Sequence, residues 1–222
     1  MAYLDQKTAQ KVQELLAPIG YDVEMVVFTT ALQLPGRETG HQAETVELLR
    51  EVAQLNPQLR LIQESLGSEK AQALGIDRAP TTLLREGGSA RDNLRFLGLP
   101  SGYEFSTLIE ALVMLGTGES GLSDQLQREL SAIAGPLTLQ TFVTPTCPYC
   151  PSAVLTAYRL AYHHPQVLAI GTQASEFPGL SERWQIRGVP DTIVSGKRTE
   201  RVLGGQPERA FLEAALRATS AA

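Results

Sequence analysis

The chain has 222 residues, of which 43% are apolar and 19% charged, and its formal net charge is −5. This ordinary globular composition excludes a disordered or collagen-like chain, and the length allows one large domain or two small ones. The excess of acidic residues argues against a general nucleic-acid surface. The apolar stretches are far shorter than the roughly 18 residues that cross a bilayer, and the N-terminal residues lack the apolar core of a secretion signal. We therefore expect a cytoplasmic protein that binds neither nucleic acid nor membranes.

The first half of the chain alternates helical and strand-like patterns. The apolar, β-branched run Met25–Thr30 is typical of a buried strand, and the helical spacing of apolar residues over Val46–Ala53 predicts a helix that faces the core. The segments Ile76–Leu84 and Arg95–Gly98 follow, and we expect this half to end in two strands and a closing helix. The Gly-rich polar patch Gly116–Gly121 then predicts a joint between two units.

The second half shows the same alternation, which favours a layered α/β structure. The short turn Ser195-Gly196-Lys197 predicts that the last two strands form an antiparallel hairpin, so the sheet should be mixed. The predicted elements are a helix over Asp124–Ala134, a strand over Leu137–Thr144, a helix over Pro148–His163, a strand over Val167–Gln173, a helix over Ser175–Gln185, strands over Asp191–Ser195 and Arg198–Leu203, and a helix over Pro207–Arg217.

The two halves repeat each other. Three pairs of segments match in the same order: Met25–Thr30 with Leu139–Thr144, Ile76–Leu84 with Ile186–Val194, and Arg95–Gly98 with Arg201–Gly204. Ordered matches of this kind indicate a duplicated unit. We expect an α/β fold of two tandem domains, residues 1–118 and 119–222, each with a mixed central sheet flanked by helices.

The two cysteines of the chain stand three positions apart in Cys147-Pro148-Tyr149-Cys150, after a predicted strand and at the start of a predicted helix. If Cys147 caps that helix, unpaired N–H groups and the helix dipole favour its thiolate, and Pro148 fits the first helical position. Cys150, one turn later, could then attack a mixed disulfide formed at Cys147. The alternatives are two inert buried thiols or half of a metal site. Because His163 and His164 lie too far along the predicted helix to complete a zinc site, we expect no metal and no other cofactor.

Three segments, Phe142–Cys150, Trp184–Pro190 and Arg201–Gly204, resemble the active-site strand, the cis-proline loop and the final strand of a thioredoxin fold. Two such units in tandem resemble the protein disulfide oxidoreductases of thermophilic prokaryotes, also called glutaredoxin-like proteins. The N-terminal part of the flavoprotein component of alkyl hydroperoxide reductase is also similar. The resemblance implies two thioredoxin-like domains.

It also implies a role for each site residue. Cys147 would be the attacking thiol and Cys150 the resolving thiol, with Pro148 and Tyr149 between them at the substrate surface. Val189 and a cis Pro190 would form the backbone surface against which a substrate strand pairs.

Some positions depart from this pattern. The first unit has Gln33–Gly36 where the cysteine motif would stand, so we expect it to be redox-silent; it would serve as a scaffold or bind a partner through Leu32 and Leu34. Thioredoxins place a buried acid where this chain has Thr141, so proton transfer from Cys150 must use another group or water. The turn Gly204-Gly205 is similar to one that helps glutaredoxins hold glutathione.

The sequence therefore predicts a thiol–disulfide oxidoreductase that acts on disulfide-containing proteins and receives electrons from a thioredoxin-reductase-like flavoprotein. One alternative is an electron-donor module for a peroxidase such as a peroxiredoxin. Another is a client-binding, chaperone-like module in which redox activity is secondary.

Overall fold

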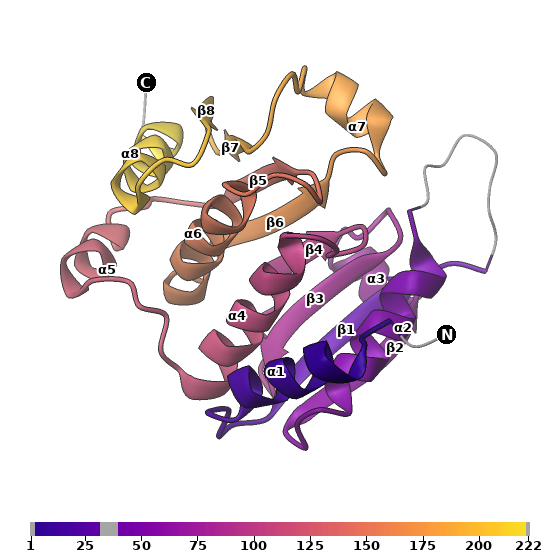
Figure 1. Cartoon of the computed structure of the whole chain (residues 1–222). Coiled ribbons are helices and arrows are strands. Elements are labelled where there is room, and N and C mark those ends of the chain that lie inside the picture. Colours follow the sequence, from indigo (N-terminus) through magenta and orange to yellow (C-terminus); the bar gives the residue numbers. More distant parts are fainter. Residues whose placement is uncertain (1–2, 32–39, 221–222) are drawn as a thin grey trace.

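The computed structural model describes residues 3–31 and 40–220, and both halves follow the predicted order of elements (Figure 1). The first half contains α1 (Gln6–Leu16), β1 (Val23–Thr29), α2 (Gln42–Ala53), β2 (Leu59–Ser65), α3 (Glu69–Ala73), β3 (Thr81–Glu86), β4 (Leu94–Leu97) and α4 (Glu104–Thr117). The second contains α5 (Asp124–Leu130), β5 (Leu137–Val143), α6 (Cys150–His163), β6 (Val167–Gln173), α7 (Pro178–Arg183), β7 (Asp191–Ser195), β8 (Thr199–Leu203) and α8 (Glu208–Thr219).

The predicted strands of the second half agree with the structure to within a residue, and in the first half β1 begins two residues before the run Met25–Thr30. Three helices are shorter than predicted. Helix α6 begins at Cys150 rather than Pro148. Helix α7 begins at Pro178, because proline suits the first helical turn, and the chain leaves it at Gln185, whose φ is 53°. Helix α5 ends at Leu130, where the following Ser131 donates its hydroxyl hydrogen bond back to the helix.

A single sheet runs through both halves, with the strand order β2-β1-β3-β4-β6-β5-β7-β8. The two sets of four strands join where β4 pairs in parallel with β6, with Leu94 opposite Ala169 and Leu97 opposite Thr172. The terminal hairpin of β7 and β8 is antiparallel, as the turn predicted. The α/β fold class with a mixed sheet flanked by helices is thus confirmed.

The two faces of the sheet are covered differently. On one face α4 and α6 lie side by side, and a single apolar cluster runs from β1 through these helices to α8 (Figure 1). On the other face two separate clusters form, one around Phe28 and Leu83 near α3 and one around Phe142 and Leu180 near α7. The halves therefore share one large core on the α4/α6 face, whereas on the other face only Leu97 of β4 joins the cluster of the second half.

The joint between the halves begins later than predicted. Gly116 lies inside α4, where its close approach to Ile19 leaves no room for a side chain. The helix ends at Gly118, which takes the left-handed conformation with φ 75° and donates its N–H to Met114 O. The division at residues 118 and 119 stays a prediction.

No helix within residues 3–31 and 40–220 is long and apolar enough to cross a membrane.

Candidate active site

The two cysteines lie beyond the carboxyl end of β5, an inner strand of the sheet. Strand β5 stops at Val143, and the turn that follows is closed by the N–H of Cys147, which donates to Thr144 O over 3.2 Å. Cys147 and Cys150 form a disulfide with their Cα atoms 5.5 Å apart. The N–H of Cys150 also donates to Cys147 O over 3.3 Å, so the four-residue motif is itself a closed turn.

The predicted cap of the helix was wrong by two positions. Tyr149 is the N-cap of α6, Cys150 is its first residue, and Pro151 rather than Pro148 stands in the first turn. Pro148 belongs instead to the turn that spans the motif. Cys147 thus precedes the helix and is tied to its first residue through the disulfide.

The two sulfur-bearing residues differ in exposure. Cys147 is 8% exposed, whereas Cys150 is fully buried among the apolar residues beneath α6. Tyr149 is 69% exposed and Pro148 is exposed beside it. Solvent and partner molecules therefore reach the motif from the side of Cys147.

The loop before β7 supplies the second part of the site. The Val189–Pro190 peptide bond is cis, as the sequence pattern indicated, and so is Ala79–Pro80 at the corresponding place in the first half. Pro190 is buried, Val189 is half-buried, and no hydrogen bond to the main chain of Val189 is found among the described residues. The carbonyl of Pro190 accepts the N–H of Gly204 over 2.8 Å.

The turn after β8 closes the site on a third side. Gly204 has φ 76°, a conformation that favours glycine, and a side chain at Gly205 would come within 3.3 Å of Tyr149 Cβ. The structure thus brings together the cysteine motif, the cis-proline loop and the Gly-Gly turn.

The first half also reaches the site, which the sequence did not indicate. The N–H of Tyr103 donates to Pro145 O over 2.9 Å, and Gly102, with φ 61°, lies so close to Pro145 that an added Cβ would overlap its carbonyl. The start of α4 therefore supports the loop that leads to Cys147.

Glu104, the first residue of α4, is fully buried there. Its Oε2 accepts a hydrogen bond from Thr107 over 2.8 Å, while no partner for Oε1 occurs in the described chain. Burial raises the pKa of Glu104 to about 7, although the bond from Thr107 acts in the opposite direction. Sequence reasoning missed this residue, yet the signal was there: Glu104 stands four positions before Leu108 on the same buried helix face.

Thr141, which stands where thioredoxins have an acid, is fully buried and hydrogen-bonded to Thr192 over 2.9 Å. A second buried acid, Asp191, follows Pro190, but it belongs to the α7 face and forms an ion pair with Arg201 over 3.4 Å. Burial raises the pKa of Asp191, and the charge of Arg201 opposes this. Glu104 is therefore the buried carboxyl on the side of the sheet that carries the disulfide.

Two other expectations concern metal ions and the first half. Among the described residues, no group of three or more His, Cys, Asp or Glu side chains could hold a metal ion. The segment Gln33–Gly36 and the expected partner surface at Leu32 and Leu34 lie outside the described residues.

Comparison with known proteins places the fold. Residues 138–217 match a thioredoxin domain family. A protein disulfide oxidoreductase from Aeropyrum pernix superposes with a TM-score of 0.84 over 98% of this chain and 95% of its own, at 26% identity. The NTD_N/C domain of alkylhydroperoxide reductase AhpF from Enterococcus faecalis also gives 0.84, over 96% of this chain and all of its own, at 25% identity. The resemblance to both groups is thus confirmed.

Curated relatives are also similar to this chain in sequence. The F component of alkyl hydroperoxide reductase from Pseudomonas aeruginosa is 29% identical over 143 residues, 63% of this chain. Its Escherichia coli counterpart is 26% identical over 160 residues, 72% of this chain. The matches cover only 27% and 29% of these relatives, so the chain spans under a third of their length. In fold and in its Cys-Xaa-Xaa-Cys disulfide, the chain is similar to the thioredoxin-like oxidoreductases.

Proposed function

We propose that this chain catalyses dithiol–disulfide exchange with protein disulfides, with Cys147 as the attacking thiol and Cys150 as the resolving thiol. The unequal burial of the two cysteines carries the proposal: only Cys147 borders on solvent, while Cys150 is enclosed within the core. A substrate can therefore form a mixed disulfide with Cys147, and Cys150 remains out of its reach.

The reaction proceeds in two exchanges, starting from the reduced dithiol. The Cys147 thiolate attacks a substrate disulfide, forms a mixed disulfide and displaces the first substrate sulfur. Cys150 then loses its proton and attacks the Cys147 sulfur, which releases the second substrate sulfur and leaves the Cys147–Cys150 disulfide. Two electrons pass to the substrate, and an external reductant must restore the dithiol; we assign this role to a thioredoxin-reductase-like flavoprotein.

The cis-proline loop is the proposed docking edge. Because the main chain of Val189 has no hydrogen-bonding partner in the described chain, its N–H and C=O are available to an extended substrate segment, which would pair with them as an added strand. Pro190 shapes this edge, and Pro148 and Tyr149 form its exposed neighbour. Such pairing recognises backbone, so it is compatible with many protein substrates.

Glu104 is our candidate for receiving the Cys150 proton. Thr141 cannot do so as an acid, and Glu104 lies where α4 supports the active-site loop through the Tyr103–Pro145 contact. A carboxyl with a pKa of about 7 can both bind and release a proton near neutral pH.

A second function, electron donation to a peroxidase, is favoured by the curated relatives, which are components of alkyl hydroperoxide reductase. The exchange chemistry would be the same, but the substrate would be the disulfide of a peroxiredoxin. A client-binding, chaperone-like module, in which redox activity is secondary, remains the alternative outside redox catalysis.

Insulin reduction by dithiothreitol, with and without the protein, tests the main proposal. We expect a clear acceleration that Cys147→Ser abolishes, whereas Cys150→Ser accumulates mixed disulfides with insulin. The assignment is reversed if Cys147→Ser traps the substrate and Cys150→Ser keeps full turnover. A protein that only suppresses aggregation of the reduced chains, equally well as Cys147→Ser, would be a client-binding module.

Peroxide consumption with a bacterial peroxiredoxin separates the two redox functions. An electron donor would sustain peroxide turnover at low micromolar concentration and reduce insulin poorly. A general oxidoreductase would show the opposite preference.

A further inference from the structure

The face of the sheet opposite α4 and α6 contains a cleft at the seam between the two halves. It lies where β4 meets β6, between the apolar cluster near α3 and the one near α7. The cleft has a volume of about 210 Å³. Its lining comes from both halves and includes Arg78, Arg95, Gln140, Arg183 and Trp184.

Arg95 is a buried cation in this cleft. Its side chain projects from the middle of the sheet, between Leu83 of β3 and Ile170 of β6, and the residue is only 8% exposed. Its Nε donates to Asp92 O over 3.0 Å and one terminal nitrogen donates to Leu74 O over 2.9 Å. Both acceptors are neutral carbonyls, and no ion pair with a carboxylate occurs among the described residues.

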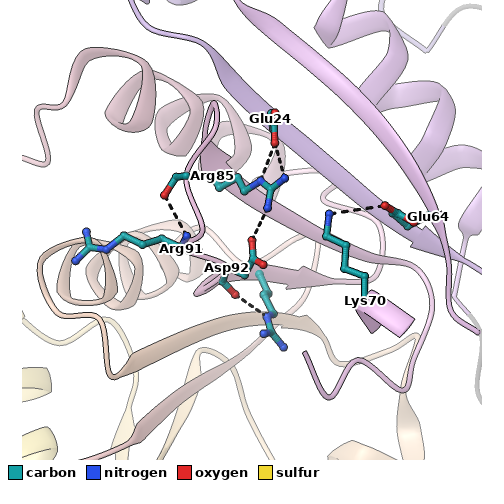
Figure 2. A network of polar contacts seen from close by, with 8 residues as sticks. Glu24, Glu64, Lys70, Arg85, Arg91 and Asp92 are labelled. Carbon is teal, nitrogen blue, oxygen red and sulfur yellow. Dashed lines mark hydrogen bonds and ion pairs between the residues drawn. The ribbon is translucent and has the colours of Figure 1, made fainter. Parts of the chain in front are cut away.

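Asp92, the acid whose charge acts on Arg95, is already engaged elsewhere. Figure 2 shows Arg85 between Glu24 and Asp92, with ion-pair distances of 2.7 Å and 3.0 Å. The Asp92 carboxylate is thus directed to Arg85, and only its main-chain oxygen serves Arg95. Burial accordingly lowers the pKa of Arg95, an effect that the charge of Asp92 opposes.

Two further arginines line the cleft, one from each half of the chain. Arg78, in the loop after α3, is paired with the exposed Asp77 over 2.7 Å. Arg183, at the end of α7, lies over the ring of Trp184 at 5.7 Å and has no carboxylate partner in the described chain. The cleft therefore carries an excess of two positive charges in a chain whose net charge is −5.

We propose that this cleft binds a small organic oxyanion, a phosphate ester or a carboxylate, between Arg95, Arg78 and Arg183. A buried guanidinium without a counter-ion is costly, and an oxyanion offers paired acceptors that match its planar donors. The Nε2 of Gln140 donates to Thr172 Oγ1 over 3.1 Å, which leaves its second hydrogen for the ligand, and the Trp184 indole supplies an apolar wall for the carbon part. The volume suits a compound smaller than a drug-sized ligand, for which pockets of about 300 Å³ or more are usual.

This site is separate from the disulfide and goes beyond the proposed exchange reaction. Trp184 nevertheless begins the segment that ends at Val189 and Pro190, so a bound anion would contact the start of the docking loop.

The only tryptophan of the chain lines the cleft, so its fluorescence reports binding directly. Inorganic phosphate and malonate are titrated into the oxidised protein, with sodium chloride at matched ionic strength as reference. We expect a saturable change in Trp184 emission with one site per chain by calorimetry, and a rise in melting temperature of about 3 °C or more at saturation. Tighter binding of phosphate identifies a phosphate ester, and tighter binding of malonate a carboxylate.

Variants test whether phosphate or malonate binds in this cleft. Arg183→Gln and Arg78→Gln should each weaken binding, measured by calorimetry, about tenfold, while Arg128→Gln, which removes an exposed arginine on α5, should leave it unchanged. Arg95→Gln should abolish binding, but it also loses two hydrogen bonds to main-chain carbonyls, so the first two variants carry the test. A response identical to that of chloride, or parental affinity in both Arg183→Gln and Arg78→Gln, would overturn the proposal.

Discussion

Replacing Glu104 with glutamine should change how the stability of the protein depends on pH. The pKa of Glu104 is about 7 in the folded chain, where its ordinary value is 4.5. Between these two pH values the folded chain holds a proton that the unfolded chain has released. Folding then takes up a proton, so stability falls as the pH rises through this range and stays at the lower level above pH 7.

The size of the effect follows from the two pKa values. At about 1.4 kcal/mol per pH unit, the ionisable Glu104 costs the folded protein about 3 kcal/mol at pH 8 relative to pH 4.5. This is a large part of the roughly 5–15 kcal/mol that stabilises a typical domain. Glutamine cannot ionise and can still accept the hydrogen bond from Thr107, so the Glu104→Gln variant should not lose this stability.

The assay is urea unfolding of the oxidised protein, followed by circular dichroism at pH 4.5, 6, 7 and 8. The free energy of unfolding of Glu104→Gln minus that of the parent should rise by about 3 kcal/mol across the series. Glu110→Gln, an exposed change on the same helix, is the matched control and should give a constant difference. A difference for Glu104→Gln that is equally flat would show that Glu104 ionises normally in the folded chain.

Three further predictions concern the site and its support. In the reduced protein, iodoacetamide should modify Cys147 faster than Cys150, because Cys147 borders on solvent and Cys150 is fully buried, and equal reactivity of both would contradict the assigned roles. Gly102→Ala should lower the free energy of unfolding in urea by about 2 kcal/mol or more and slow insulin reduction, because the added Cβ would overlap the Pro145 carbonyl and the φ of Gly102 is positive. Unchanged stability and activity would refute the support of the loop before Cys147 by α4. A fragment of residues 120–222 should keep a disulfide that can be reduced, but it should melt at a lower temperature than the full chain. The reason is that the fragment exposes the edge of β6 and the side of α6 that packs on α4. An unchanged melting temperature would show that the halves are independent.

The redox motif and the repeat could be predicted from the sequence because their signals are local. Alternation of apolar strands and amphipathic helices depends on residues a few positions apart, and proline restricts the backbone wherever it stands. Cys147 and Cys150 therefore fall at a strand-to-helix turn in the structure as predicted, and Val189–Pro190 takes the cis form. The exact start of α6 was missed, since both Pro148 and Pro151 are compatible with a first helical turn.

The contacts between the halves were decided by the tertiary structure. Strands β4 and β6 join through main-chain groups that every residue possesses, so no side-chain pattern marks this pairing in advance. That junction brings α4 beside α6, buries Glu104 near the active-site loop, and places Arg95 between two cores that do not merge. The pKa of both side chains depends on how much water their surroundings exclude, which is a property of the assembled fold rather than of neighbouring letters in the sequence.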